Sequence, residues 1–184
     1  MTSSERFWNF SVRTYREEGV PAACLALQDE RGADVNVLLF CMWVGATRGE
    51  LGDQVYSAAL RYSEEWCTNV VAPLRRVRTW MKLEGCHSPP TPSDECMALR
   101  EKVKGVEFAA EKMQEETLES LLAHVPAGDF PLSRQVDCIA KNLRRYCADK
   151  GIQLDDWSVE RLATIARAAA EAPDAGAFEA ALTT

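Results

Sequence analysis

Apolar residues recur every three or four positions along almost the whole chain, which is the period of an amphipathic α-helix. Alternating apolar and polar runs, which are typical of strands, are nearly absent. No Asn-Gly or Asp-Gly hairpin turn occurs either. The pattern therefore predicts an all-α fold, a compact bundle of seven or eight helices.

One segment is apolar on every side rather than along one stripe. Residues 35–44 read VNVLLFCMWV, and Asp34 directly before them can cap a helix. A helix with no polar face belongs inside a bundle. We expect residues 34–45 to form the buried central helix, wrapped by the first, second and fourth helices.

A second apolar stripe runs over residues 55–81 and keeps its phase across Pro73. This predicts a kinked helix or two helices nearly in line. Three prolines in residues 85–93 then end the helical pattern. A long amphipathic helix over 94–124 follows, with the stripe Leu99, Val103, Val106, Ala110, Met113, Thr117 and Leu121. Its polar face fits a solvated bundle helix or a coiled-coil-like hairpin.

These breaks divide the chain into a helical core over residues 1–85, a proline-rich loop over 86–93 and a helical extension over 94–184. The extension contains three shorter predicted helices, at about 133–149, 156–171 and 175–182. No internal repeat separates them. We expect the extension to pack on the core as one domain.

The net charge and the cysteines indicate which partners and which cellular compartment to expect. The formal net charge of −7 repels nucleic acid at long range and disfavours it as a partner. The seven cysteines include no CxxC pair, which is typical of unpaired thiols in a reducing compartment. No apolar run reaches the roughly 20 residues that a membrane helix needs. We expect a cytoplasmic protein without a membrane segment.

The first half resembles a bacterial family of conserved proteins whose defining domain has no assigned function. The resemblance rests on FWNFSVRTY at residues 7–15 and on the pattern ACLxLQDxxGxDVNxLLFCxW within residues 19–45. A weaker match, VVAPLRRVRTWMK, follows at residues 70–82. The similarity covers about residues 5–85 and implies a helical, cytoplasmic bacterial protein. It implies no activity and no catalytic residues.

The polar turn LQDERGADVN, residues 27–36, is the main candidate site. Asp29 and Glu30 fall in the last turn of a predicted helix, where negative charge is unfavourable, so a basic group should compensate. The turn is read either as a structural network that fixes the angle between two helices, with Asp34 as a cap, or as a polar pocket. The candidate binding residues are Trp8, Gln28, Asp29, Asp34, Asn36, Trp43, Arg48, Arg75, Arg76 and Arg78.

Cys86, His87 and Cys96 flank the proline-rich loop and are a weak candidate zinc site. Zinc favours sulfur and imidazole ligands, but these cysteines are ten positions apart rather than in a close pair. The simpler interpretation is two unpaired loop cysteines.

The sequence contains no cofactor motif, and its two histidines leave few arrangements for nucleophilic catalysis. We therefore expect a noncatalytic protein that interacts with a protein partner, either itself or another protein, and that needs no cofactor. Two alternatives stay open. One is a small-ligand binder or enzyme that uses the polar turn, and the other is a zinc protein.

Overall fold

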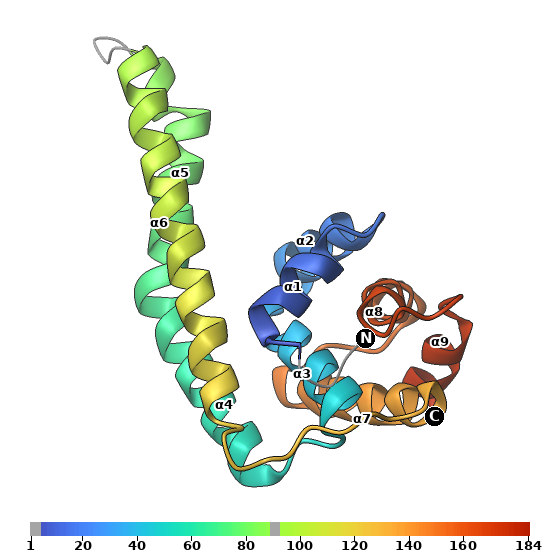
Figure 1. Cartoon of the computed structure of the whole chain (residues 1–184). Helices are drawn as coiled ribbons and strands as arrows, with labels where there is room; N and C mark the ends of the chain where they lie inside the picture. The colour runs from blue at the N-terminus through green and yellow to red at the C-terminus, as the bar shows by residue number, and fades with distance from the viewer. Residues whose placement is uncertain (1–4, 89–92) are drawn as a thin grey trace.

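The computed structural model describes residues 5–88 and 93–184, and every regular element in these ranges is helical (Figure 1). The elements are α1 (Phe7–Tyr15), α2 (Val20–Arg31), α3 (Val35–Thr47), α4 (Asp53–Trp66), a π-helical segment η1 (Cys67–Val71), α5 (Ala72–Leu83), a short 3₁₀ turn η2 (Gly85–His87), α6 (Ser93–Ser120), α7 (Leu132–Lys150), α8 (Asp156–Ala169) and α9 (Gly176–Thr183). Because α4, η1 and α5 form one rod, these ranges contain eight helices, which confirms the all-α prediction.

Helix α3 is the buried central helix that the apolar run predicts. Every residue from Val37 to Thr47 is buried. The Asp34 Oδ1 accepts hydrogen bonds from the backbone N–H groups of Asn36, at 2.9 Å, and of Val37, at 3.3 Å. The side chain of Asp34 therefore satisfies two of the donors that begin the helix.

The neighbours of α3 differ from the expectation. Its most extensive contact is with α7, whereas its contacts with α1, α2 and α4 are small. The two helices approach closely at Gly45, where an added Cβ would lie 2.7 Å from the Ile139 Cα. When a helix is apolar on every side, its sequence does not indicate which other helix packs against it. The sequence therefore did not predict the contact between α3 and α7.

The rod confirms the prediction of two helices nearly in line across Pro73. The π-helical segment Cys67–Val71 lies directly before the proline, and the Ala72 N–H donates to the Cys67 carbonyl. The wider turn accommodates a residue that has no backbone N–H of its own. The apolar stripe thus passes the proline without a break in the helix.

Helices α5 and α6 run side by side as an antiparallel hairpin that projects from the body formed by α1–α3 and α7–α9 (Figure 1). The long-helix prediction holds, but α6 ends at Ser120 and a turn follows over residues 121–124. Most of its predicted apolar stripe is not buried, since Leu99, Val106 and Met113 are more than half exposed, although Ala110 of the stripe is buried. The buried positions include Glu107, Ala110, Gln114, Glu115 and Leu118.

At the hairpin tip, Cys86 and Cys96 form a disulfide, with their Cα atoms 5.2 Å apart. This corrects the expectation of unpaired loop cysteines. A separation of ten positions in the sequence does not determine how far apart Cys86 and Cys96 lie in space. The two cysteines meet because α5 and α6 pair as a hairpin. Residues 89–92 of the proline-rich loop lie outside the described ranges.

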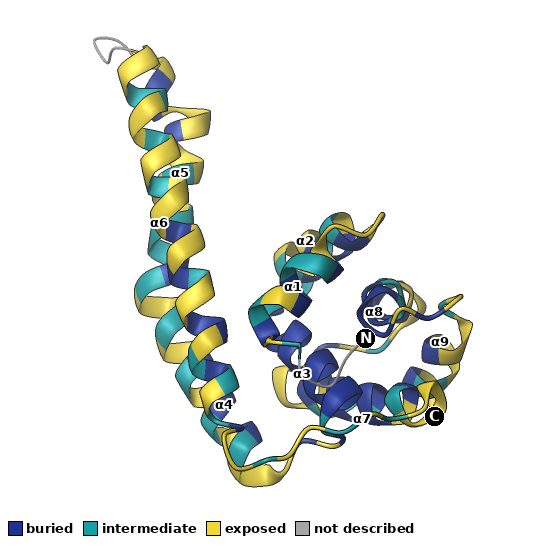
Figure 2. Ribbon diagram, viewed as in Figure 1, coloured by how far each residue is buried: buried dark blue, intermediate teal, exposed yellow. Residues whose placement is uncertain are grey.

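The body contains one continuous hydrophobic core, and Figure 2 shows its buried residues gathered around α3, α7 and α8. Side chains from both halves of the chain contribute, among them Phe7, Trp43, Leu143, Ile165 and Phe178. The outer part of the hairpin is mostly exposed (Figure 2). Within the described ranges, no helix is long and apolar enough to cross a membrane.

Candidate functional site

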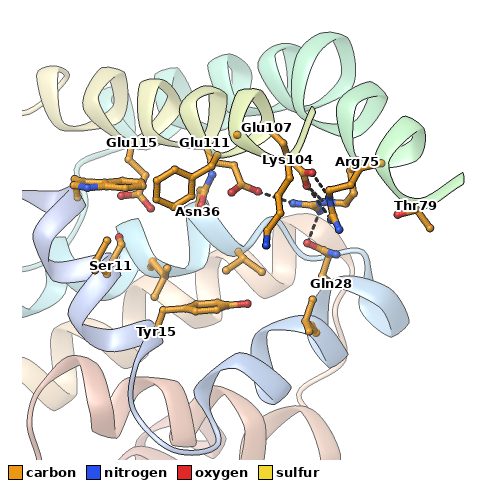
Figure 3. Close-up of a pocket in the computed structure, with 18 of the residues that line it drawn as sticks. Ser11, Tyr15, Gln28, Asn36, Arg75, Thr79, Lys104, Glu107, Glu111 and Glu115 are labelled. Carbon is orange, nitrogen blue, oxygen red and sulfur yellow. Dashed lines mark hydrogen bonds and ion pairs between the residues drawn. The ribbon is translucent and has the colours of Figure 1, made fainter. Parts of the chain in front are cut away.

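A cavity of about 820 Å³ opens between the hairpin and the body, and we call it the hairpin cleft (Figure 3). Helices α5 and α6 form one wall, and α1, α2 and the first turns of α3 form the other. The lining residues are Trp8, Ser11, Val12, Tyr15, Leu25, Gln28, Asp29, Val35, Asn36, Leu39, Arg75, Arg78, Thr79, Glu101, Lys104, Gly105, Glu107, Phe108, Glu111 and Glu115. The volume lies within the range of small-molecule sites.

Aromatic and aliphatic side chains cover much of the cleft. The ring of Trp8 on α1 meets the ring of Phe108 on α6 edge to face, with centroids 5.0 Å apart. Leu39 lies on the α3 side and Tyr15 on the α1 side. The Trp8–Phe108 contact joins the body to the hairpin and gives the cleft an apolar wall.

The outer end of the cleft, towards the hairpin tip, is a network of paired charges. The Arg75 guanidinium donates to the carboxylates of Glu107, at 3.2 Å, and Glu111, at 2.9 Å, and to the Gln28 carbonyl oxygen. Arg78 pairs with Glu107 as well. Burial disfavours the charged forms of Arg75 and Glu107. The ion pairs that they form favour the charged forms more strongly, so the pKa of Arg75 is raised and the pKa of Glu107 is lowered.

The inner end of the cleft, near the base of the hairpin, contains Glu115 on α6 and Ser11 on α1 (Figure 3). Only 3% of Glu115 and 4% of Ser11 is exposed. The Glu115 Oε2 and the Ser11 Oγ have no hydrogen-bond partner among the described residues. Burial, followed by the nearby carboxylates Glu111, Asp34 and Glu119, raises the pKa of Glu115 to about 8, while the neighbouring Ser11 hydroxyl partly opposes the rise.

The polar turn itself is tied to α6 and α7. The Gln114 amide donates to the Asp34 Oδ2 at 3.0 Å and accepts from the Asn36 amide at 2.8 Å. The backbone N–H of Asp34 donates to the Tyr146 hydroxyl at 2.8 Å. Burial raises the pKa of Asp34, against the hydrogen bonds that it accepts. Asp34 and Asn36 thus belong to a network that fixes the start of α3.

Six of the residues proposed from the sequence line the cleft: Trp8, Gln28, Asp29, Asn36, Arg75 and Arg78. Asp34 lies beside it, in a smaller pocket of about 180 Å³ that shares Gln28, Asn36 and Arg75. Arg75 reaches the turn through a hydrogen bond to the Gln28 carbonyl oxygen, whereas its ion pairs are with Glu107 and Glu111 rather than with the turn. The Gln28 amide in turn donates to the Asp29 carboxylate.

The structure does not bring Trp43, Arg48 and Arg76 to the cleft. Trp43 is fully buried in the body, stacked on Phe7 with ring centroids 5.1 Å apart. Arg48 covers the Trp43 ring, with its guanidinium carbon 4.2 Å from the centroid. Arg76 is exposed on the rod. Because α3 is apolar on every side, its sequence does not indicate whether Trp43 faces the polar turn or the core. This is why the sequence placed Trp43 among the candidate binding residues.

The zinc candidates also need correction. The sulfurs of Cys86 and Cys96 are bonded to each other, so neither is a thiolate ligand, and His87 is exposed. Elsewhere in the described residues, one group has ligand atoms close enough to hold an ion: Glu50, Asp137 and Cys138. The Lys141 ammonium already binds the carboxylates of Glu50, at 2.7 Å, and Asp137, at 3.1 Å.

Sequence reasoning missed the α6 wall: Glu107, Phe108, Glu111, Gln114 and Glu115. One signal was present. Carboxylates occur every fourth residue at positions 107, 111, 115 and 119, which places them on one helix face, where like charges repel each other. A stripe of this kind predicts cations or other partners opposite it. The polar face that was expected to be solvated instead contains the buried residues Glu107 and Glu115.

Comparison with curated proteins and with solved structures gave no match. One family model matches residues 6–118, from the start of α1 almost to the end of α6. The match thus includes both walls of the hairpin cleft and extends beyond the resemblance over residues 5–85. Because it covers more than half of the chain, this protein belongs to the family described as protein of unknown function (DUF2390).

Proposed function

We propose that this chain is a noncatalytic small-ligand-binding protein and that the hairpin cleft is its site. One observation carries the proposal: the cleft of about 820 Å³ contains two buried polar atoms, the Glu115 Oε2 and the Ser11 Oγ, without a partner among the described residues. Leaving such groups unpaired costs about 1–3 kcal/mol each. A bound ligand that supplies the missing hydrogen bonds removes this cost.

The arrangement supports binding rather than catalysis. The arginines of the outer end hold Glu107 and Glu111 in ion pairs, which commits these carboxylates to structure. The apolar wall from Trp8 to Phe108 favours the body of an organic molecule. The ligand therefore enters between α1 and α6 and reaches the inner end with a polar group.

A fragment screen by ligand-observed NMR tests this proposal with a variant that fills the cleft. Gly105 lines the cleft, and a Cβ added there meets nothing within 4 Å. Gly105→Leu should therefore fold, gain helix propensity and abolish fragment binding. Lys102→Leu is the matched control, because Lys102 is exposed on the same helix and does not line the cleft. Fragments that bind the Gly105→Leu variant as well as the parent would refute the cleft as the site.

A protein partner on the hairpin is the second candidate, and the distribution of exposed apolar residues favours it. In the described parts of the chain, seven of the ten exposed large hydrophobic residues lie on α5 and α6: Val77, Trp80, Leu83, Leu99, Val106, Phe108 and Met113. A concentration of this kind on one projecting element is typical of a protein contact. The partner is either a second copy of the chain or another protein.

Sedimentation of the purified chain at increasing concentration tests self-association first. Leu83→Gln and Leu99→Gln change side chains that are 67% and 53% exposed, so they should weaken association without loss of folding. Pull-downs from the native host, with and without these substitutions, then test another partner. A monomer that captures the same proteins with and without the substitutions would contradict the hairpin as the contact surface.

We keep the bacterial cytoplasm as the proposed location and nucleic acid as a disfavoured partner. Five cysteines are free: Cys24, Cys41, Cys67, Cys138 and Cys147. Free thiols are typical of reducing compartments, whereas the Cys86–Cys96 disulfide is typical of oxidising ones. Alkylation of the seven cysteines in native extracts, followed by mass spectrometry, decides between them. Reduced Cys86 and Cys96 support the cytoplasm.

A further inference from the structure

The inner end of the hairpin cleft contains a buried carboxyl oxygen without a hydrogen bond of normal geometry. Only 3% of Glu115 is exposed, and its Oε2 has no such partner among the described residues, although the Ser11 hydroxyl lies near enough to oppose the rise in its pKa. Figure 3 shows Glu115 on α6 and Ser11 on α1 at the same end of the cleft, away from Arg75 and Thr79. A buried carboxylate without donors is costly unless a partner is supplied. Water or a ligand must supply it, and the cleft gives a ligand access.

The charges around Glu115 indicate the sign of the missing group. On its own helix it is affected by Glu111 and Glu119, and at the start of α3 it faces Asp34. Helix α1 contributes the neutral Ser11 hydroxyl and, further along the cleft, Tyr15, while α2 contributes Gln28 and Asp29. The largest interactions of Glu115 with charged groups are with carboxylates, and they disfavour its ionised form. A cation is the group that this environment lacks.

The cations near the cleft are committed to other carboxylates. Arg75 and Arg78 of α5 bind Glu107 and Glu111. Arg6, before α1, binds Glu119. On α6, Lys104 pairs with Glu101 and Lys112 with Glu116. An anionic ligand would have to break these pairs or bind beside the Glu115 carboxylate, which repels it. A cationic ligand can bind Glu115 and leave the pairs intact.

The walls beside Glu115 favour an organic body over a bare inorganic ion. Trp8 and Phe108 form an edge-to-face pair, and Val12 and Leu39 add aliphatic surface. Tryptophan and tyrosine faces also attract organic cations. A metal ion would gain nothing from these apolar walls. An amine with an aromatic or aliphatic body would contact both the walls and the Glu115 carboxylate.

Building on the proposed ligand-binding function, we propose that the hairpin cleft binds a small organic amine, whose ammonium group donates hydrogen bonds to Glu115 and Ser11 and whose body packs against the apolar wall that Trp8 and Phe108 form. The carboxylate then gains the donor that it lacks and a positive charge among its negative neighbours. A charge-assisted hydrogen bond of this kind is roughly twice as strong as one between neutral groups.

Three probes with one skeleton test the inference by isothermal titration calorimetry at pH 8.5. They are tryptamine, tryptophol and indole-3-acetate, which carry an ammonium, a hydroxyl and a carboxylate on the same indole. We expect tryptamine to bind at least about tenfold more tightly than tryptophol, and indole-3-acetate most weakly. Glu115→Gln should remove the preference for tryptamine and leave the affinity for tryptophol unchanged.

Glu116→Gln is the matched control, because Glu116 is the next residue on α6, is exposed and pairs only with Lys112 in the described structure. It should retain the preference. Lowering the pH from 8.5 to 6 protonates Glu115, whose pKa burial raises to about 8, and should weaken tryptamine binding to the parent protein. The same change in pH should leave tryptamine binding to the Glu115→Gln variant unaltered.

Equal affinities for tryptamine and tryptophol, a preference for tryptamine that survives in Glu115→Gln, or tightest binding by indole-3-acetate would each overturn the amine inference. Failure of all three probes to bind would overturn it too. The broader ligand-binding function is decided separately, by the fragment screen with Gly105→Leu. The two ideas therefore fail on different measurements.

Discussion

The contact between α3 and α7 and the contact between the body and the hairpin both join helices that are distant in sequence, and the second contains the cavity of about 820 Å³. In the first, the buried amide of Asn142 uses both its donor and its acceptor atoms. Asn142 donates to the carbonyls of Cys41, at 3.1 Å, and Gly49, at 3.3 Å, and accepts from the Leu51 N–H at 2.9 Å. In the second, the carboxyl of Glu115 is equally buried and has an oxygen without a partner among the described residues.

The difference teaches where to look for function in a helical protein without recognisable motifs. A contact that serves stability satisfies its buried polar groups and closes around apolar side chains. A contact that leaves a buried carboxyl unpaired beside a cavity gives up stability at that place. The hairpin cleft is a contact of this second kind, whereas the contact between α3 and α7 is of the first kind.

The largest expected effect separates two tryptophans. Trp43→Ala should lower the free energy of unfolding by about 3–5 kcal/mol, because it leaves a cavity in the closed core. Trp8→Ala, on the wall of an open cleft, should lower it by about 1 kcal/mol. Urea denaturation followed by circular dichroism measures both values. Equal losses would show that the cleft is packed as closely as the core.

The second prediction concerns the charge of Glu115. Its pKa of about 8 in the folded chain exceeds the ordinary value of 4.5, so the folded state retains a proton that the unfolded state loses between these pH values. This contribution to stability therefore falls as the pH rises from 4.5 to 8 and is constant above 8. Glu115→Gln should be more stable than the parent by up to about 3 kcal/mol at pH 7.

Denaturation midpoints of the parent and the Glu115→Gln variant, measured at pH 4 and pH 7, check this prediction. The difference should vanish at pH 4, where the carboxyl is protonated in both states. An equal difference at both pH values would mean that the charge of Glu115 is not its cause. Glu116→Gln, on the exposed face, should show little difference at either pH.

The third prediction tests the close approach of α3 and α7. Gly45→Ala introduces a Cβ only 2.7 Å from the Ile139 backbone, which should cost about 2 kcal/mol of stability. Gly105→Ala places its methyl group in the open cleft, where nothing lies within 4 Å. It should increase stability by about 0.5–1 kcal/mol through helix propensity. Thermal unfolding of both variants gives the comparison, and a loss in both would contradict it.

The smallest expected loss is at the outer end of the cleft. Arg75→Ala leaves Glu111 without an ion-pair partner in the described structure, while Glu107 keeps Arg78. Since these groups are partly exposed, we expect a loss of about 1–2 kcal/mol. Arg76→Ala, at the exposed neighbouring position, should change stability by less than about 0.5 kcal/mol. Similar values for both would show that the paired network does not stabilise the hairpin.

Much of the fold follows from local patterns. The period of the apolar residues predicted the all-α class, the central helix, the rod across Pro73 and the short C-terminal helices. Local rules also identified Asp34 as a cap and six residues of the cleft. These features depend on helical periodicity and on the chemistry of a single turn, which neighbouring residues determine.

The remaining features depend on which helices meet. The sequence by itself determined that the chain is helical, that α3 is buried, and that the turn before α3 is polar. Only the tertiary structure decided that α7 covers α3, that Cys86 pairs with Cys96, and that Glu115 faces the cleft. Helical periodicity specifies the faces of each element, but the free energy of packing between distant elements selects the partner of each face. The position of Glu115 in the cleft is therefore a result of how the hairpin packs against the body.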